Sequence, residues 1–378
     1  MIDDAKFGHA LNQIENFGAL RLKKVFDIFG SFKNCWEADP SQLKNKINDG
    51  FLVQFILENR NKINPEKEWR EILEKGVKVI TMNDSIYPPL LKEIAMPPSL
   101  LYFQGDILAL SSNYSVAVVG TRRATYYGLE TAFRLSRELA LKGINIVSGL
   151  AMGVDTQAHR GCLEVGGLPA DLSARRAQTE DSAKTGKTFA VLGSGLLKIH
   201  PRINFGLSQR IIEQGGAVIS EYPPSLTADK WTFPQRNRII AGLASLTLVA
   251  EAPEKSGALI TARFALDSNR DVGIVPGEIH SIASKGSNKF LKHGAYPICE
   301  ASDVLEILGI EEKPLSLFEN EFFDKNELLI LDGIKTAPFL EQLPESTGLD
   351  IKILNQKLSL LELKGAIRNI NGRFERIK

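Results

Sequence analysis

The sequence predicts an α/β protein whose central domain is a doubly wound parallel sheet, with a small helical domain before it and a winged helix after it. Short β-branched runs alternate with amphipathic stretches from Val116 to Val275, and apolar residues recur at helical spacing over residues 1–65. The last residues hold an Asn-Gly turn between two short runs. We therefore expect a helical domain at 1–75, a sheet domain at 76–310, a linker at 311–325 and a winged helix at 326–378.

Composition and charge limit the functions open to the chain. Lys and Arg total 46 against 45 Asp and Glu, a formal charge of +1, so any anion site must be local. The 43% apolar and 24% charged residues are typical of a globular chain. No apolar run has the length of a membrane span, and Met1 to Lys6 do not begin a signal peptide, so we expect a cytoplasmic protein without a membrane partner. Cys35, Cys162 and Cys299 have neither disulfide nor metal-ligand spacing.

The first residues carry a helical pattern. Leu11, Ile14 and Phe17 recur at helical spacing, and Gly30-Ser31 is typical of a helix end followed by the cap of a new helix. Short helices joined by glycine turns can bind a DNA backbone, but these residues favour a packing or docking module. After them, four prolines in residues 87–100 predict an extended connector into the next domain.

From Val116 onward, β-branched runs and amphipathic runs alternate. The expected strands are 116–119, 144–147, 188–192, 217–219, 246–249 and 272–275. The expected helices are 129–141, 154–165, 204–214 and 258–268. Alternation of this kind predicts a doubly wound parallel sheet, in which ligands bind outside the carboxyl ends of the strands. The loops at those ends are therefore the first place to search for a site.

The last part of the chain begins with an acidic and aromatic stretch, which is typical of a linker. Three short helical patterns follow, at 326–331, 338–343 and 350–363, and then residues 366–370 and 373–377 predict a hairpin. Three helices and a hairpin indicate a winged helix. The last 15 residues carry five basic side chains and one acidic one, a local charge of +4, so DNA contact and protein docking both stay open there.

The strand at 116–119 ends in a glycine turn that opens a helix, G-T-R-R-A-T-Y-Y-G from Gly120 to Gly128. N–H groups at a helix N-terminus bind anions, and glycine lets a phosphate approach closely. Arg122 and Arg123 add charge-assisted hydrogen bonds. The pattern favours a phosphate cradle over a plain turn, because a plain turn does not need two adjacent arginines.

Two further glycine turns end the next strands. The turn from Ser148 to Gly153 leads into a helix where Asp155 and His159 are spaced for one face, which suggests acid–base chemistry. A capping Asp and a packed His are the favoured interpretation. The turn at 193–195 lacks the third glycine of a dinucleotide fingerprint, and T-G-K-T at 185–188 lacks the upstream glycine of a Walker A loop. We therefore expect no cofactor, no metal and no catalytic residue.

The richest stretch is F-P-Q-R-N-R at 233–238. Its arginines, Arg236 and Arg238, flank an Asn at an expected helix start, and residues 255–257 (K-S-G) open the next helix with free N–H donors. Together with the earlier turns they predict a groove for a polyanion, in which fixed dipoles and cations hold a diester backbone without reading base edges.

A structural role for the same arginines is the alternative. Glu221 follows the apolar run before the F-P-Q-R-N-R stretch, and Glu251 follows the apolar run after it. Arg236 and Arg238 would then form salt bridges with one of these carboxylates and bind no ligand. The residues alone leave this alternative open.

At these residues the chain resembles the DNA-processing protein A family, DprA, also called Smf. The resemblance covers about residues 87–308, through motifs that include G-T-R-R-x-T-x-Y-G, S-G-L-A-x-G-x-D-x-x-A-H, A-V-L-G-S-G, S-E-Y-P, F-P-x-R-N-R-I-I-A-G-L, S-G-A-L-I-T-A and V-P-G. It implies an extended Rossmann-like domain that binds single-stranded DNA as a homodimer, loads the RecA recombinase and protects incoming strands in natural transformation, without being an enzyme. The N-terminal part resembles a sterile-alpha-motif-like (SAM-like) domain, and the C-terminal part resembles a winged-helix-like domain.

The chain departs from the family in two places. After A-V-L-G-S-G the family usually continues with an Asp and then Tyr-Pro, whereas residues 196–201 keep only the proline, which weakens a carry-over of roles to this loop. The family also lacks the polar stretch from Leu168 to Gly186. We expect that stretch to be a mobile surface excursion, and we assign no DNA contact to Arg175 or Arg176.

We expect single-stranded DNA at the carboxyl edge of the sheet, with Asn237 orienting the neighbouring loop or contacting the strand. Four cations are expected on phosphates: Arg122, Arg236, Arg238 and Lys289. Three aromatic side chains are candidates for base stacking, or else are packed: Tyr126, Tyr127 and Phe290. The full expected set is Gly120, Thr121, Arg122, Arg123, Ser148, Gly149, Gly153, Arg236, Asn237, Arg238, Lys255, Ser256, Gly257 and Lys289.

Two other functions stay open. A nucleotide-cleaving hydrolase of the lysine-decarboxylase-like group has a similar fold, but its P-G-G-x-G-T-x-x-E pattern is absent, with Pro276-Gly277-Glu278-Ile279 the nearest string. A regulator of double-stranded DNA would act through the C-terminal winged helix alone.

Overall fold

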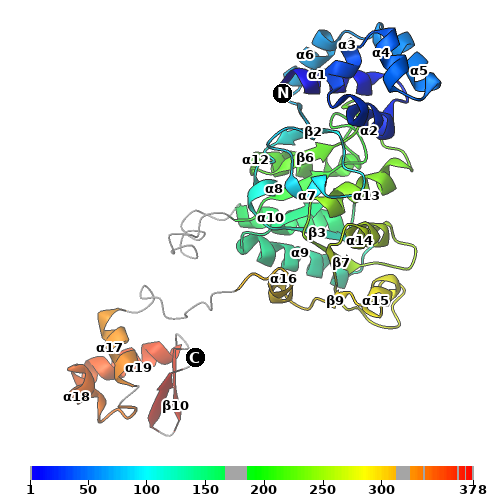
Figure 1. Ribbon diagram of the computed structural model, residues 1–378. Helices are drawn as coiled ribbons and strands as arrows, with labels where there is room; N and C mark the ends of the chain where they lie inside the picture. Colours follow the sequence, from blue (N-terminus) through cyan, green and yellow to red (C-terminus); the bar gives the residue numbers. More distant parts are fainter. Residues whose placement is uncertain are drawn as a thin grey trace. The chain divides into compact units, whose positions relative to one another are not determined.

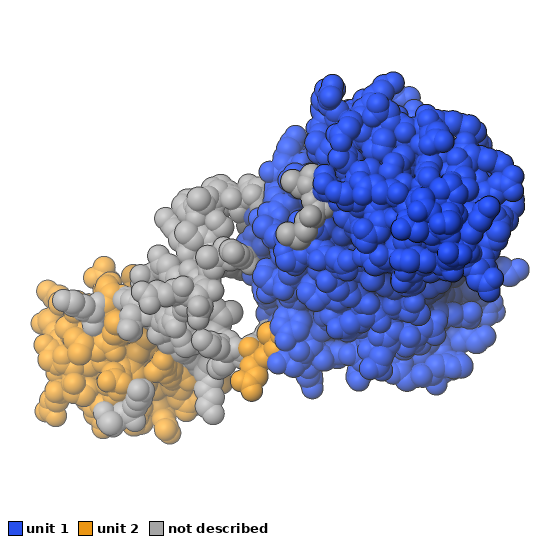
Figure 2. Space-filling view, turned by 45° about the horizontal axis from the view of Figure 1, so that its top comes forward, with its two compact units in different colours: residues 1–309 blue, residues 310–378 orange. Residues whose placement is uncertain are grey.

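A computed structural model of the chain divides into two compact units, residues 1–309 and 310–378 (Figures 1 and 2). The residues it describes are 2–166, 185–311, 324–334, 337–363, 366–370 and 372–376. Most of the expected excursion at 168–186, with Arg175 and Arg176, and most of the expected linker lie outside these ranges. No helix in the described ranges is long and apolar enough to span a bilayer.

Six helices begin the first unit. They are α1 (Ile2–Gln13), α2 (Gly18–Phe29), α3 (Phe32–Glu37), α4 (Pro40–Lys46), α5 (Gly50–Arg60) and α6 (Pro65–Glu74). Gly30 ends α2 at a φ of 66°, with its N–H donating to Phe26 O, and Ser31 caps α3 by accepting the N–H of Asn34. The helix end and the new cap predicted at Gly30-Ser31 are therefore confirmed.

A mixed sheet forms the centre of the first unit. Within the described residues its strands are β1 (Lys78–Thr81), β2 (Leu100–Gly105), β3 (Ser115–Gly120), β4 (Asn145–Ser148), β5 (Thr188–Val191), β6 (Ala217–Ser220), β7 (Leu246–Glu251), β8 (Asp271–Ile274) and β9 (Tyr296–Pro297). The order is β1-β2-β6-β5-β4-β3-β7-β8-β9. Strands β3 to β9 pair in parallel, while β1 and β2 pair antiparallel at one edge. The expected α/β class with a large, doubly wound parallel sheet is confirmed.

Helices cover both faces of this sheet (Figure 1). They are α7 (Pro89–Lys92), α8 (Ala109–Ser112), α9 (Tyr126–Leu141), α10 (Val154–Gly166), the 3-10 helix η1 (Arg202–Asn204), α12 (Phe205–Glu213), α13 (Thr232–Gly242), α14 (Gly257–Asp267), α15 (Lys285–Leu291) and α16 (Ala301–Ile307). One apolar core joins the sheet to α7, α13 and α14, and a second joins its other face to α10, α12 and the N-terminal helices.

The strand order reverses between β3 and β7. From β3 the chain adds β4, β5 and β6 on one side, and then crosses to add β7, β8 and β9 on the other. Gly120 and Glu251, at the carboxyl ends of the two strands, are register partners. The loops that leave these ends must diverge to opposite faces, and the crevice between them is where ligands of doubly wound sheets bind.

The second unit holds α17 (Lys325–Gly333), α18 (Leu343–Thr347), α19 (Ile351–Leu363) and the antiparallel hairpin β10 (Ile367–Ile370) and β11 (Arg373–Arg376). The predicted position of the middle helix, 338–343, is wrong, because this helix is α18 at Leu343–Thr347. Pro338 O accepts the N–H of Phe374 at 2.7 Å, and Phe339 forms a bridge with Arg373, so this segment pairs with the hairpin. The assignments as SAM-like and winged-helix-like domains stay predictions.

Acid should destabilise the first unit through His159. This residue is buried on α10 with Nδ1 2.7 Å from Thr188 Oγ1, and burial lowers its pKa to about 3. In the unfolded chain an imidazole titrates near about 6.5, so stability present above that pH is lost as the pH falls, by about 2 kcal/mol between pH 7 and pH 5. Urea unfolding at both pH values measures this loss.

The matched variant is His159→Asn, which keeps a polar side chain and removes the titration. Its loss of stability between pH 7 and pH 5 should be about 2 kcal/mol smaller than that of the unchanged chain. Buried His9, whose pKa is lowered to about 4, contributes equally to both proteins. Equal pH dependence in the two proteins would show that His159 is protonated while folded.

Candidate nucleic-acid interface

A cavity of about 610 Å³ opens at the reversal point between β3 and β7. The β3–α9 turn, α13, the start of α14 and the loop before α15 supply its walls. A small second cavity of about 30 Å³ adjoins it and shares Arg122, Ala151, Phe233 and Arg236. We call the two together the groove. Nine of the expected residues line its main cavity: Gly120, Thr121, Arg122, Arg123, Arg236, Asn237, Lys255, Ser256 and Gly257.

A buried carboxylate fixes the β3–α9 turn. Glu251, at the end of β7, accepts the N–H and the hydroxyl of Thr125, each at 2.7 Å. Thr125 in turn caps α9 by accepting the N–H of Gly128 at 3.2 Å. Arg122 and Arg123 project exposed from this braced turn. Both oxygens of Glu251 therefore bind the turn, and Glu251 forms no salt bridge with Arg236 or Arg238 of α13. The part of the structural alternative that paired these arginines with Glu251 is wrong.

Arg122 rests on an aromatic ring in the groove. Its guanidinium carbon lies 5.0 Å from the ring centroid of Phe233, which is half-buried and lines both cavities. Phe233 belongs to the motif F-P-Q-R-N-R, but the sequence predicted no role for it. Its position three residues before Arg236 on one helix was the available signal, because residues at that spacing share a helix face.

Arg236 is buried at the base of the groove and connects two segments of main chain. It is 4% exposed, and its Nη1 donates to Gly149 O at 2.7 Å and to Val191 O. Asp155 lies beside it and accepts the N–H groups of Gly149 and Ala151 at 3.1 and 3.4 Å. Burial lowers the pKa of Arg236 to about 10, and burial raises the pKa of Asp155 against the opposing effect of the guanidinium.

Helix α13 begins earlier than the sequence predicts. The helix begins at Thr232, so Arg236 and Arg238 lie in its second turn and not at its start. Their backbone N–H groups are therefore not the free donors that the sequence suggested. The side chain of Asn237 does bridge to the next helix, because its Nδ2 donates to Gly257 O at 3.2 Å, which agrees with the expected role of orienting the neighbouring loop.

Arg238 belongs to a buried ion pair and does not line the groove. Its Nη2 lies 2.5 Å from Oε2 of Glu221, whose side chain is 2% exposed. Burial raises the pKa of Glu221, and the Arg238 guanidinium opposes this. The structural alternative therefore holds for Arg238. Its guanidinium pairs with Glu221, so we no longer count Arg238 among the residues expected to contact phosphates. It does not hold for Arg236, whose described bonds go to main-chain carbonyls.

The remaining small residues shape the groove from behind. Ser148 is buried and donates its hydroxyl to Val118 O at 2.7 Å. Gly153 has a φ of 81°, and a Cβ there would collide with the carbonyl oxygens of Thr121 and Arg122, so the close approach of the two turns requires glycine. Ser256 caps α14 by accepting the N–H of Ala258 at 3.3 Å.

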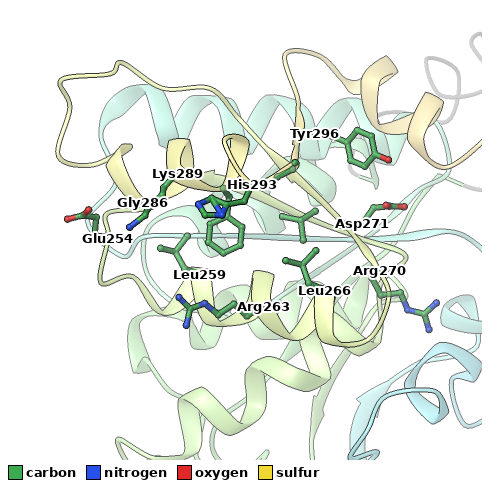
Figure 3. A pocket seen from close by; sticks show the side chains of 14 residues that line it. Glu254, Leu259, Arg263, Leu266, Arg270, Asp271, Gly286, Lys289, His293 and Tyr296 are labelled. Carbon is green, nitrogen blue, oxygen red and sulfur yellow. The ribbon is translucent and has the colours of Figure 1, made fainter.

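Lys289 lies elsewhere. It lines a separate, mostly apolar cavity of about 490 Å³ beside β8 and β9, together with Arg263 and His293, as Figure 3 shows. The sequence predicted that Lys289 contacts a phosphate in the groove, but α15, which carries it, follows another strand of the sheet. That strand is β8, one place beyond β7, so α15 lies beyond the reversal point.

The stacking candidates also separate. Tyr126 and Tyr127 are 80% and 51% exposed at the start of α9, and Tyr127 Oη donates to Pro276 O at 3.0 Å. Phe290 is half-buried, packs against the sheet core and lines the cavity of Figure 3. The structure therefore supports its packed interpretation.

The paired residues Asp155 and His159 do not face each other. Asp155 binds the 149–151 turn, and His159 Nδ1 contacts Thr188, so no acid–base pair forms between them. Among the described residues, no group of three or more His, Cys, Asp and Glu side chains is placed to hold a metal ion.

Comparison with known proteins identifies the family. Residues 78–309 match the model of the DNA recombination-mediator protein A family. The chain belongs to this family. Protein Smf of Escherichia coli is 33% identical over 379 residues, which cover 95% of each chain. The structure resembles that of DprA from Streptococcus pneumoniae at a TM-score of 0.62, with 29% identity over 79% of this chain and 95% of the other.

A second solved relative comes from Helicobacter pylori. It is a DNA processing protein A whose structure concerns its single-stranded DNA binding mode. The TM-score is 0.50, with 28% identity over 61% of this chain and 95% of the other. The matched family segment contains every residue that lines the groove, from Val119 to Ala283.

Removing Arg238 alone should destabilise the fold. The variant Arg238→Met leaves the Glu221 carboxylate buried without a cation, which costs about 3 kcal/mol or more. The double variant Arg238→Met, Glu221→Leu should recover most of that stability, because both charges leave together. Urea unfolding at pH 7 measures all three proteins. A double variant no more stable than the single one would contradict this assignment.

Proposed function

We propose that the protein binds single-stranded DNA in the groove and acts as a recombination mediator without catalysing a reaction. The observation that carries this proposal is the convergence of nine sequence-predicted residues on one cavity at the reversal point of the sheet. Family membership and the H. pylori relative support it.

Exposed cations and helix ends supply the contacts to phosphate. Arg122, Arg123 and Lys255 are exposed on the groove and form no ion pair within the described part of the chain. The N-terminus of α14, at Gly257, adds backbone N–H groups and the positive end of a helix dipole. Such contacts hold a sugar-phosphate chain whatever its sequence.

Arg236 acts by position in this proposal. Its buried guanidinium donates to the carbonyl that follows β4 and to the one that ends β5, and so holds the floor of the groove on which the DNA strand would lie. Phe233 offers the aromatic surface for a base, since Arg122 can leave the ring for a phosphate. The expected phosphate contact of Arg236 is thereby replaced by a supporting role.

The homodimer, the loading of RecA and a role in natural transformation rest on the family resemblance. Light scattering of the purified chain tests the dimer. Assembly of RecA on strands already coated with a single-strand-binding protein, with and without this chain, tests the loading. A location in the cytoplasm stays a prediction from composition.

The absence of catalysis has a direct test. The purified chain is incubated with nucleoside monophosphates, and released base is measured by chromatography. We expect no turnover together with binding of oligo-dT. Release of base would favour the nucleotide-cleaving hydrolase instead.

Arg122 and Arg236 should differ in how their loss changes salt dependence. Arg122→Ala should weaken oligo-dT binding and reduce the slope of log K against log salt by about 0.7, the value of one phosphate contact on a single strand. Arg236→Gln should weaken binding with the slope unchanged, because its guanidinium contacts main-chain carbonyls. Anisotropy titrations over a range of salt measure both slopes.

The matched control is Arg134→Ala, which removes an exposed arginine of α9 outside the groove. It should change neither affinity nor slope. Thermal melting of each variant checks that the fold persists. A slope reduction for Arg236→Gln as large as that for Arg122→Ala would return Arg236 to the phosphate ligands.

Deletion of the second unit separates groove binding from the winged-helix alternative. A chain ending at Gly309 keeps every residue of the groove, so its affinity for oligo-dT should stay within about twofold of the full chain, since the phosphate contacts are retained. Competition between single and double strands measures the preference of both chains. Loss of all DNA binding would assign it to residues 310–378.

A further inference from the structure

We propose that His200 makes the grip of the groove on single-stranded DNA depend on pH, because its protonated imidazole adds a contact to phosphate at one end of the groove. The inference rests on the proposed function, and it names the regulation of that same site. Nothing in the sequence motifs assigned a role to this residue.

The position of His200 in the groove carries the inference. Its exposed side chain lines the small cavity with Arg122, Gly149 and Arg236. Its ring centroid lies 5.5 Å from that of Phe233, the same ring on which Arg122 rests. A phosphate bound by Arg122 beside the Phe233 ring would therefore also lie close to the imidazole of His200.

The segment that carries His200 is braced on both sides. Leu197 N–H donates to Pro224 O at 2.9 Å, which ties the segment to the loop after β6. Asn204 Nδ2 donates to Leu150 O at 2.8 Å, which ties it to the turn after β4. The ring is thus presented to the groove by fixed backbone and does not need to be recruited from a distance.

Elimination singles out His200 among the five histidines of the chain. His9 and His159 are buried, and burial lowers their pKa to about 4 and about 3. His293 lines the separate cavity of Figure 3. His280 is exposed in the loop before α15 and lines neither part of the groove. Histidine is the side chain that changes charge between about pH 5 and 8, so His200 is the groove residue suited to this range.

The neighbouring charges give the sign of the effect. Across the small cavity the ring faces Arg122, from the β3–α9 turn, and Arg236, from α13, with Asp155 of α10 beside Arg236. Lys198 and Arg202 flank it on its own segment. A phosphate bound beside the ring favours the protonated imidazole, because opposite charges attract. Strand binding therefore takes up a proton, and by linkage the affinity rises as the pH falls.

The test uses the full chain and a labelled oligo-dT, whose bases do not titrate in this range. Anisotropy titrations between pH 5.5 and 7.5 should give binding about fivefold tighter at the acid end, as one exposed charge pair supplies. The salt slope should steepen by about 0.7 at pH 5.5. His200→Tyr, which keeps an aromatic ring and removes the titrating nitrogens, should flatten both responses.

Two further variants sharpen the result. His200→Lys carries a permanent charge and should bind at pH 7.5 as tightly as the unchanged chain does at pH 5.5. His293→Tyr makes the same substitution outside the groove and should keep the full pH response. Asp155 is present in every variant, so any titration of its carboxyl cancels in the comparison. Melting curves check each fold.

The outcomes separate the inference from the proposed function. No binding of oligo-dT by the unchanged chain at any pH would overturn the proposed function. Binding with an undiminished pH response in His200→Tyr would leave the groove in place and overturn the role of His200. A flat response in His200→Tyr with a full response in His293→Tyr would establish it.

Discussion

The groove depends on one buried guanidinium. Arg236 donates to the carbonyl oxygen of Gly149, just after β4, and to that of Val191, at the end of β5. Beside it, Asp155 accepts N–H groups of the turn that follows β4. Carbonyl oxygens at the carboxyl ends of parallel strands repel an approaching phosphate. With these oxygens engaged by a cation, the N–H groups and exposed cations around them set the local field. The proposed binding of a polyanion therefore does not require a net positive charge on the whole chain, whose formal charge is +1.

The reversal of strand order determines where that site lies. Strands β4 and β7 flank β3 on its two sides. The β3–α9 turn and the start of α14 therefore lie on opposite walls of the cavity. Glu251 uses the same point to brace the turn through Thr125. A carboxylate at the rim of the groove would oppose the proposed binding of phosphate if it faced the ligand, but the two oxygens of Glu251 accept a backbone N–H and a hydroxyl.

Much of this arrangement follows from the sequence, and its failures have physical causes. The strands from β3 to β8 are short apolar runs that contain β-branched residues, and the glycine turns after several of them mark the ligand edge. The strands β1, β2 and β9 were missed for different reasons. Strand β1 lies before the alternating pattern that begins at Val116, β2 follows a run of prolines, and β9 has only two residues. Arg236 and Arg238 are two positions apart on a helix, so they face different directions. Which one meets a carboxylate depends on Glu221, a residue of another element.

The N-terminal helices belong to the same network as the groove. Asn12, on α1, donates to Tyr102 on β2 and to the carbonyl of Glu221, at 3.1 and 3.4 Å. Glu221 in turn holds Arg238, so α13 is anchored on one side by this ion pair and on the other by the bonds of Arg236. Buried polar groups of this kind are costly unless every partner stays in place. The packing of the helices on the sheet therefore contributes to holding α13, and with it the floor of the groove, in one position.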